Sequence, residues 1–179
     1  DENGFSFTLA DLKPLDEGEI DYDLVNGANE AFICALVTET ENNDNGVNDP
    51  ETAAGDTDDG AGNGELGDFL NFKFGTQTGS LSAISGQWQT VGTTSANTTT
   101  SSGFSYCFGE FDGNNECVLG TTDDDNKAQT DSLTADVQFY AVQTRNNEDF
   151  ECSTLPTDGN GGDDRPAVGA VAFAYVAPE

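Results

Sequence analysis

The sequence predicts an all-β protein, an antiparallel β-sandwich with long acidic loops, in a single domain that spans residues 1–179. Polar and apolar residues alternate with a period of two in several short runs, which is typical of half-buried strands. No extended run shows the 3.6-residue period of an amphipathic helix. Because a parallel sheet needs covering helices, strands without helices favour two antiparallel sheets packed face to face.

The expected strands follow one another along the chain. Residues 5–9 and 20–24 alternate on either side of a turn at Lys13-Pro14-Leu15-Asp16. Residues 31–37 are apolar on both faces, as in a central strand that is covered on two sides. A single helical turn is expected around residues 65–70, and further strands at residues 70–74, 104–108, 133–142 and 168–176.

Three long polar segments separate these strands. Residues 38–64 are rich in Asn, Asp and Gly and exceed what a connection requires, so we expect them to be functional or mobile. Residues 93–102 are dominated by Ser and Thr and hold the sequon Asn97-Thr98-Thr99, which makes Asn97 a candidate glycosylation site. Residues 154–166 have the composition of a tether, and the apolar segment 167–177 follows it.

The balance of charge excludes several classes of partner. With 34 acidic and 5 basic residues the net charge is −29, so we expect no nucleic acid as partner, and an anionic membrane surface would repel the chain. Molar salt, with a Debye length of about 3 Å, relieves the self-repulsion, which indicates a halophilic protein. The chain has no Met and no apolar run of membrane-spanning length. We therefore expect the processed form of a secreted, extracellular or cell-surface protein, without membrane insertion.

Catalysis is not expected. The chain has no His, which removes the general base of Ser-His and Cys-His mechanisms and the His ligands of zinc. A carboxylate pair could hydrolyse a glycosidic bond, but no pair stands out, and the single Trp88 offers little surface for a sugar. We therefore predict that the protein is not an enzyme and requires no cofactor.

Calcium is the one ion for which the first acidic loop is suited. The EF-hand pattern fails because Thr52 occupies the twelfth position, where the motif requires Glu. A looser cage is conceivable because calcium accepts six to eight oxygens in flexible geometry, and its candidate ligands are Asp44, Glu51, Asp56, Asp58 and Glu65. The alternative is a solvated acidic loop, since a chain rich in Asp places some of them together by chance.

Four cysteines without a Cys-x-x-Cys pair indicate two disulfides formed in an oxidising compartment. Cys107 and Cys117 flank the turn sequence Asp112-Gly113-Asn114, so the two flanks can face each other and form a bridge. Cys34 and Cys152 remain for the second bridge, which closes a long loop. The alternative at Cys34 is a buried free thiol, which its apolar neighbours would tolerate.

Residues 5–16 form an alternating strand with the turn sequence Leu-Lys-Pro-Leu-Asp. Residues 34–66 form a central strand and an acidic loop that ends in Gly-Glu-Leu, and residues 139–147 form a later motif. In their order these motifs resemble the TasA/camelysin-type extracellular fibre proteins, most closely their haloarchaeal members, with Leu15 in place of the Gly of the family's Leu-Lys-Pro-Gly-Asp turn. The resemblance implies a jelly-roll sandwich, exported through a dedicated signal peptidase, that forms filaments in which a strand of one subunit completes the sheet of the next.

A terminal strand would serve as the donor in such an assembly. Relatives carry their donor strand ahead of the segment that corresponds to Phe5, whereas this sequence has four residues there. An unpaired sheet edge recruits any matching strand, and a contact between unlike patches propagates instead of closing. The first candidate donor lies in residues 167–177 and consists of Val168, Ala170, Val171, Phe173, Tyr175 and Val176; the second is Phe5, Phe7 and Leu9. The alternative is that residues 168–176 form the last strand of their own sandwich.

These observations lead to one functional hypothesis and one rival. The hypothesis is a structural subunit of a secreted homopolymeric filament, assembled by donor-strand exchange in a halophilic archaeon, whose partner is another copy of itself. The rival is a calcium- or glycan-binding module of the cell surface on a similar sandwich.

Overall fold

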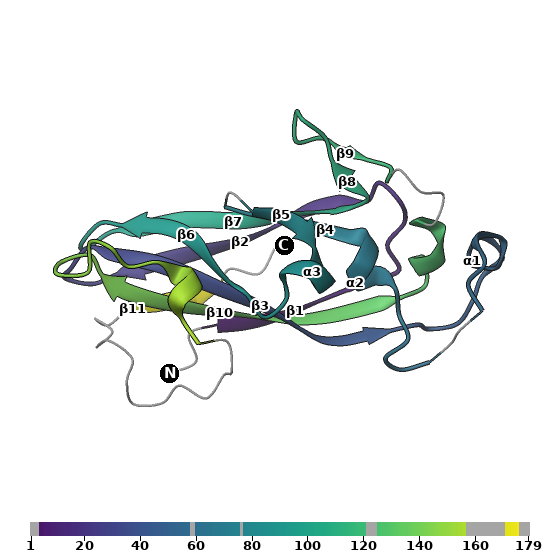
Figure 1. Cartoon of the computed structure of the whole chain (residues 1–179), viewed down its shortest axis with the longest axis horizontal. Coiled ribbons are helices and arrows are strands. Elements are labelled where there is room, and N and C mark those ends of the chain that lie inside the picture. The colour runs from purple at the N-terminus through teal and green to yellow at the C-terminus, as the bar shows by residue number, and fades with distance from the viewer. Residues whose placement is uncertain (1–3, 58–59, 76, 121–124, 157–170, 176–179) are drawn as a thin grey trace.

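The structure is a computed structural model of the whole chain (Figure 1). It describes residues 4–57, 60–75, 77–120 and 125–156, together with the backbone of residues 171–175. Most of these residues belong to antiparallel strands, and the helices are single turns or little more. The predicted all-β antiparallel sandwich is therefore confirmed.

The first sheet has four strands in the order β1-β10-β3-β6. The strands are β1 (Gly4–Ala10), β10 (Ser132–Gln143), β3 (Ala31–Asn43) and β6 (Trp88–Thr94). All neighbours are antiparallel, and the two long central strands β3 and β10 pair from Ala31 opposite Gln143 to Asn43 opposite Ser132. This pairing brings the acidic segment after β3 to the start of β10.

The second sheet has five strands in the order β11-β2-β7-β4-β5. The strands are β11 (Val171–Tyr175), β2 (Glu17–Asn26), β7 (Thr99–Phe108), β4 (Leu70–Phe74) and β5 (Gln77–Ser80). A separate hairpin of β8 (Glu110–Phe111) and β9 (Cys117–Val118) projects from one end of the sandwich (Figure 1). The short helices are α1 (Asp49–Ala54), α2 (Leu66–Phe69), α3 (Leu81–Ile84), η1 (Asp125–Ala128) and η2 (Cys152–Thr154).

The core between the two sheets is rich in aromatic rings. Tyr22 of β2 and Phe139 of β10 bring their ring centroids to 4.8 Å, and Phe74 and Phe104 of neighbouring strands to 5.0 Å. Such pairs add about 0.5–1.5 kcal/mol each beyond the area they bury. The largest fully buried side chains include Phe72, Phe74, Phe104, Phe108, Ile33, Leu66, Leu70, Leu81, Leu133 and Val137.

Strand β3 is covered on both faces, as its apolar run predicts. Ile33, Ala35 and Val37 belong to the core between the sheets. Cys34 and Leu36 point to the other face, into a second cluster with Trp88, Tyr140, Val142, Cys152 and Leu155. The segment that follows β10 therefore seals the outer face of the first sheet.

The structure corrects the expected loops. Residues 38–43, predicted as part of the acidic loop, extend β3, and residues 93–102 contribute to β6 and β7. These residues are mostly polar and half-buried or exposed, so they show no apolar alternation, and it is backbone pairing with β10, β3 and β2 that makes them strands. Strand β5 was missed for the same reason. Helix α1 was missed because its one buried residue is Glu51, so it has no apolar face.

Candidate functional site

The first site to consider is the seat of the C-terminal strand. β11 forms the edge of the second sheet and pairs with β2 alone, with Val171 opposite Asn26, Phe173 opposite Leu24 and Tyr175 opposite Tyr22. Asn26, Leu24 and Tyr22 are the buried positions of β2 at this edge. Without β11, the described strands would form a sandwich of two four-stranded sheets with β2 at an edge.

Both candidate donor segments lie at sheet edges of their own chain. Val171, Phe173 and Tyr175 belong to β11, which is the arrangement stated above as the alternative to donation. The other members of that candidate set, Val168, Ala170 and Val176, lie outside the described residues. Phe5, Phe7 and Leu9 belong to β1, which forms an edge of the first sheet beside β10. Phe7 is buried and Phe5 contacts Tyr22, so β1 is part of the core.

The chain is anchored to the sandwich immediately before the segment that leads to β11. The bridge between Cys34 and Cys152 ties η2 to β3, with the Cα atoms 5.6 Å apart. The Trp88 side chain donates a hydrogen bond from Nε1 to the Pro156 carbonyl at 3.0 Å. Residues 154–156, expected to begin a tether, are thus held by the body, and the remaining tether residues 157–166 lie outside the described part.

The two disulfides join the expected pairs. The second bridge connects Cys107 with Cys117 across a sequence separation of 10, and its Cα atoms are also 5.6 Å apart. Asp112 organises the turn between them, because its Oδ1 accepts the main-chain N–H groups of Asn114 and Glu116. These hydrogen bonds hold the pKa of Asp112 below its usual value. Two disulfides fit a protein that folds in an oxidising, extracellular setting.

The sequon lies in the tight connection between β6 and β7. Asn97 is exposed and adopts a left-handed conformation with φ of 54°. Its main-chain N–H donates to the Gly27 carbonyl, so the backbone is held while the side chain faces solvent. The position is accessible to a modifying enzyme, and glycosylation there stays a prediction.

The second site is an acidic cluster where the segment after β3 meets the start of β10. Of the five expected calcium ligands, the structure brings Asp44, Glu51, Asp56 and Glu65 into one electrostatic neighbourhood. Asp58 lies outside the described residues. A further carboxylate, Asp131, lies among them and was missed by sequence reasoning. No sequence pattern links Asp131 to this loop, since it immediately precedes a strand and looks like an ordinary turn residue.

The capping of the short helix α1 explains why the Glu51 side chain lies in this cluster. Asn48 caps α1 by accepting the Glu51 N–H at 3.0 Å, and the Glu51 carboxylate accepts the Asn48 N–H at 2.7 Å. This reciprocal capping box fixes the Glu51 side chain. The same carboxylate accepts the main-chain N–H of Thr130 at 2.6 Å and its hydroxyl at 2.8 Å. Glu51 therefore fastens α1 to the residue before Asp131.

Asp131, like Glu51, is a fully buried carboxylate of the cluster. Its side chain is 0% exposed, and its Oδ2 atom accepts the N–H groups of Glu65 at 2.6 Å and Leu66 at 3.1 Å. The other oxygen, Oδ1, is buried without a hydrogen-bond partner among the described residues. Asp131 thus stabilises the first turn of α2 with one oxygen, while the other is buried without a partner in the described structure.

The neighbouring carboxylates change one another's acidity. Burial, with the charges of Asp131, Asp56 and Asp44, raises the pKa of Glu65 to about 7. Burial also raises the pKa of Asp131 to about 6, assisted by the charges of Asp44 and Glu51, although the two main-chain hydrogen bonds oppose the rise. The cluster therefore carries an electrostatic cost at neutral pH that a proton or a cation would relieve.

Within the described residues, no group of three or more His, Cys, Asp or Glu side chains is arranged to hold a metal ion by itself. Any ion bound by the acidic cluster would need other oxygens beside the carboxylates, from amides, the main chain or water.

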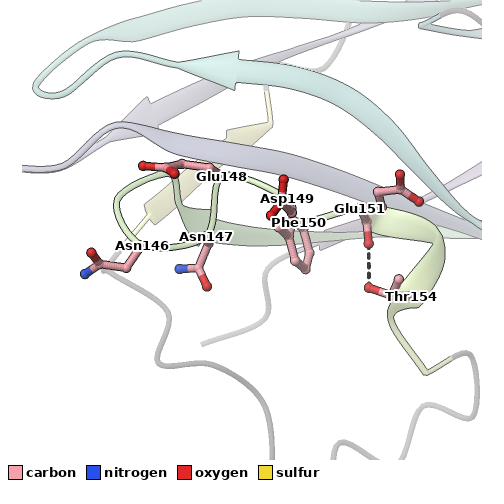
Figure 2. A pocket seen from close by; sticks show the side chains of 7 residues that line it. All are labelled: Asn146, Asn147, Glu148, Asp149, Phe150, Glu151 and Thr154. Carbon is pink, nitrogen blue, oxygen red and sulfur yellow. Dashed lines mark hydrogen bonds between the residues drawn. The ribbon is translucent and has the colours of Figure 1, made fainter.

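A third feature is a hollow of about 490 Å³ on the segment between β10 and η2. Figure 2 shows that its side chains fan out in different directions, and the one marked interaction joins the Thr154 hydroxyl to the Glu151 carbonyl at 2.6 Å. The lining is mostly polar and consists of Asn146, Asn147, Glu148, Asp149, Phe150, Glu151 and Thr154. Nothing in this arrangement converges on a ligand.

Comparisons with family models, with curated proteins and with solved structures found no match for this chain. Among the described residues, none of the helices has the length and apolar character needed to cross a membrane. The functional assignment therefore depends on the geometry set out above.

Proposed function

We propose that this chain is a non-enzymatic structural subunit of an extracellular homopolymer, which assembles when the C-terminal strand of one copy pairs with β2 of the next. The observation that carries the proposal is the position of β11. Among the described residues it is the last strand, it lies at a sheet edge, and it pairs with β2 alone.

The covalent layout supports exchange of this strand. The disulfide to Cys152 and the hydrogen bond to Pro156 anchor the chain on the body as far as residue 156. Residues 157–170 then separate the anchor from β11, and fourteen extended residues can span about 45 Å. A connection of this reach allows β11 to occupy β2 of its own chain or of an adjacent copy with the same backbone pairing.

The edge of β2 supplies the reason for a copy of β11 to be recruited. Ile20, Tyr22 and Leu24 are buried positions on β2, and an unpaired edge beside such a core leaves backbone N–H and C=O groups without their ladder partners. A strand added from another copy restores these hydrogen bonds. The same β11–β2 contacts therefore form whether β11 pairs with its own chain or with another copy. Protein concentration decides which of these two pairings prevails.

The contact propagates because its two sides differ. The donated surface is β11 and the receiving surface is the edge of β2, so each copy offers one of each. Such a heterologous contact extends into a chain of subunits unless its rotation closes a ring. With a net charge of −29 per copy, adjacent copies repel at low salt, and molar salt permits assembly.

An engineered crosslink between register partners tests the proposal. Val25 is exposed on β2 and lies opposite Ala172 of β11. In the double variant Val25→Cys, Ala172→Cys, oxidised at high protein concentration in molar KCl, exchange predicts a covalent ladder of dimers, trimers and larger species on a non-reducing gel. Electron microscopy of the same sample is expected to show filaments.

The control moves the first cysteine to a position of β2 that does not pair with β11. Glu17→Cys lies on the same strand, outside the stretch that β11 covers, and with Ala172→Cys it should give no ladder. A crosslink that forms only within single chains at every concentration, with monomers in the microscope, would overturn the proposal. Peptide mapping distinguishes the engineered bridge from exchange with the two native disulfides.

A further inference from the structure

We infer that the acidic cluster is a calcium site, formed by Asp44, Asp56, Glu65 and Asp131 together with the amide oxygen of Asn42. The inference is independent of filament formation, because the cluster lies where β3 and β10 pair with each other and involves neither β11 nor the edge of β2 that receives it.

Main-chain hydrogen bonds bring the candidate ligands together. The acidic segment folds back on the end of β3, because Asp44 and Gly60 exchange N–H to carbonyl hydrogen bonds of 3.2 Å in both directions. Gly64 donates to the Asn42 carbonyl, also at 3.2 Å. The segment from Asp44 to Gly60 carries Asp56, and the residue after Gly64 is Glu65. A cation at this place would therefore be surrounded by ligands from both arms of a closed loop.

The buried carboxylate of Asp131 is the second observation that points to a ligand. Its side chain is 0% exposed, and its Oδ1 has no hydrogen-bond partner among the described residues. Burying an ionised oxygen without a partner is costly, and here the neighbouring charges that act on the group, those of Asp44 and Glu51, have the same sign. A bound cation would supply the missing partner and turn this repulsion into attraction.

Asn42 contributes a neutral oxygen to the same place. Its Oδ1 atom is buried without a hydrogen-bond partner in the described structure. A side chain at position 64 would bring its Cβ to 2.7 Å from this oxygen, so the absence of a side chain at Gly64 leaves room for the Asn42 amide beside Glu65. Amide oxygens are regular calcium ligands.

Glu51 is excluded from the site by its existing partners. Its carboxylate already accepts hydrogen bonds from the Asn48 N–H and from the N–H and hydroxyl of Thr130. It holds α1 against the start of β10 and thereby sets the distance between Asp131 and the loop. Glu51 is therefore a positioning residue, whereas the sequence had placed it among the ligands.

The chemistry of the ligands selects calcium among common ions. All candidate atoms are oxygens, and calcium binds six to eight oxygens from carboxylates, amides, main-chain carbonyls and water in flexible geometry. Magnesium requires a near-ideal octahedron and keeps most of its water. Carboxylate and amide oxygens on the two arms of a loop are thus better suited to calcium, which tolerates irregular geometry, than to magnesium.

Calorimetry with calcium chloride tests this inference. The full chain, freed of calcium with EGTA and exchanged into chelator-free molar KCl, should bind about one equivalent with measurable heat and unfold at a higher temperature with calcium than without. Asp131→Asn should weaken calcium binding by about tenfold or more, because it removes the buried charge. Glu65→Gln should weaken it in the same direction, which guards against a folding defect of the Asp131 variant.

The matched control is Glu41→Gln, which removes an exposed carboxylate from the same stretch of β3 and should leave calcium affinity unchanged. Absence of heat together with an unchanged unfolding temperature in the unmodified chain would overturn the inference. So would equal weakening by all three substitutions, or equal affinity for magnesium, since both indicate only general attraction of cations to a polyanion.

Discussion

The carboxylate of Asp131 accepts the main-chain N–H of Glu65 at 2.6 Å, so two acidic residues far apart in sequence lie in direct contact. The contact stabilises the first turn of α2, and it also places the Glu65 side chain in the field of Asp131, Asp56 and Asp44. Burial of Glu65, together with this field, raises its pKa, and the raised pKa links folding to pH.

In the absence of calcium, the free energy of unfolding should fall as pH rises from about 5 to 8. The pKa of Glu65 is raised from 4.5 to about 7, so the folded state binds a proton that the unfolded state has released, and this contribution is lost as pH rises through the folded value. Urea unfolding in EGTA at several pH values measures the slope. The variant Glu65→Gln should have a shallower slope, and an unchanged slope would contradict the assignment.

Replacing Leu15 by Gly should stabilise the protein. Leu15 adopts φ of 78°, a left-handed conformation that costs a residue with a Cβ about 1–2 kcal/mol, and its side chain is 47% exposed. After the greater backbone entropy of Gly in the unfolded chain is subtracted, we expect a gain of about 0.5–1 kcal/mol in urea unfolding. Lys13→Gly, in the same turn at ordinary φ, should be neutral or destabilising; a gain there would show that strain at Leu15 is not the cause.

The two disulfides should contribute unequally to stability. In the chain-entropy description, a bridge across a separation of 118 is worth about 5 kcal/mol and one across 10 about 2.7 kcal/mol. The double variant Cys34→Ala, Cys152→Ala should therefore lose about 2 kcal/mol more than Cys107→Ala, Cys117→Ala. Cys34 and Cys152 also pack in the outer cluster, so cavity formation adds to the loss. Equal losses in urea unfolding would show that the reduced chain retains structure around Cys34.

Asn26 should be more sensitive to replacement by Asp than by Ala. Its buried Nδ2 donates to the carbonyl groups of Asn29, Thr94 and Ser95 at 2.7, 3.1 and 2.9 Å, which joins the end of β2 to the end of β6. Asn26→Ala leaves carbonyls without a donor and should cost about 1–3 kcal/mol. Asn26→Asp sets a carboxylate against the same carbonyls and should cost more at pH 7 than at pH 3, as thermal unfolding at the two pH values can show. A smaller loss for Asp than for Ala would contradict this role.

Asn97 should carry a glycan when the protein is produced in a secreting host. The residue is exposed, in a turn that the Gly27 carbonyl holds through a main-chain hydrogen bond. Mass spectrometry of the secreted chain should show added mass that Asn97→Gln removes. An identical mass for the two proteins would exclude modification at this position.

The sequence by itself determined the fold class and the central strands. Alternation in residues 5–9, 20–24 and 104–108 reports which face of each strand meets the core, and that information is local. The apolar run of β3 likewise indicated cover on both faces, which the second sheet and the Cys152 segment supply. Charge and composition also predict that nucleic acid is not a partner, for a reason that needs no structure, since counterion release requires a basic surface; this stays a prediction.

Only the tertiary structure decided the polar strands and the membership of the acidic cluster. β5, the end of β3 and the start of β7 have little apolar pattern, because their strand character comes from backbone partners elsewhere in the chain. Asp131 joins Asp44 and Glu65 because β10 pairs with β3 in one particular register. The local sequence around such residues does not indicate which strands will pair. A site formed by strand pairing can therefore be identified only when the partners of each strand are known.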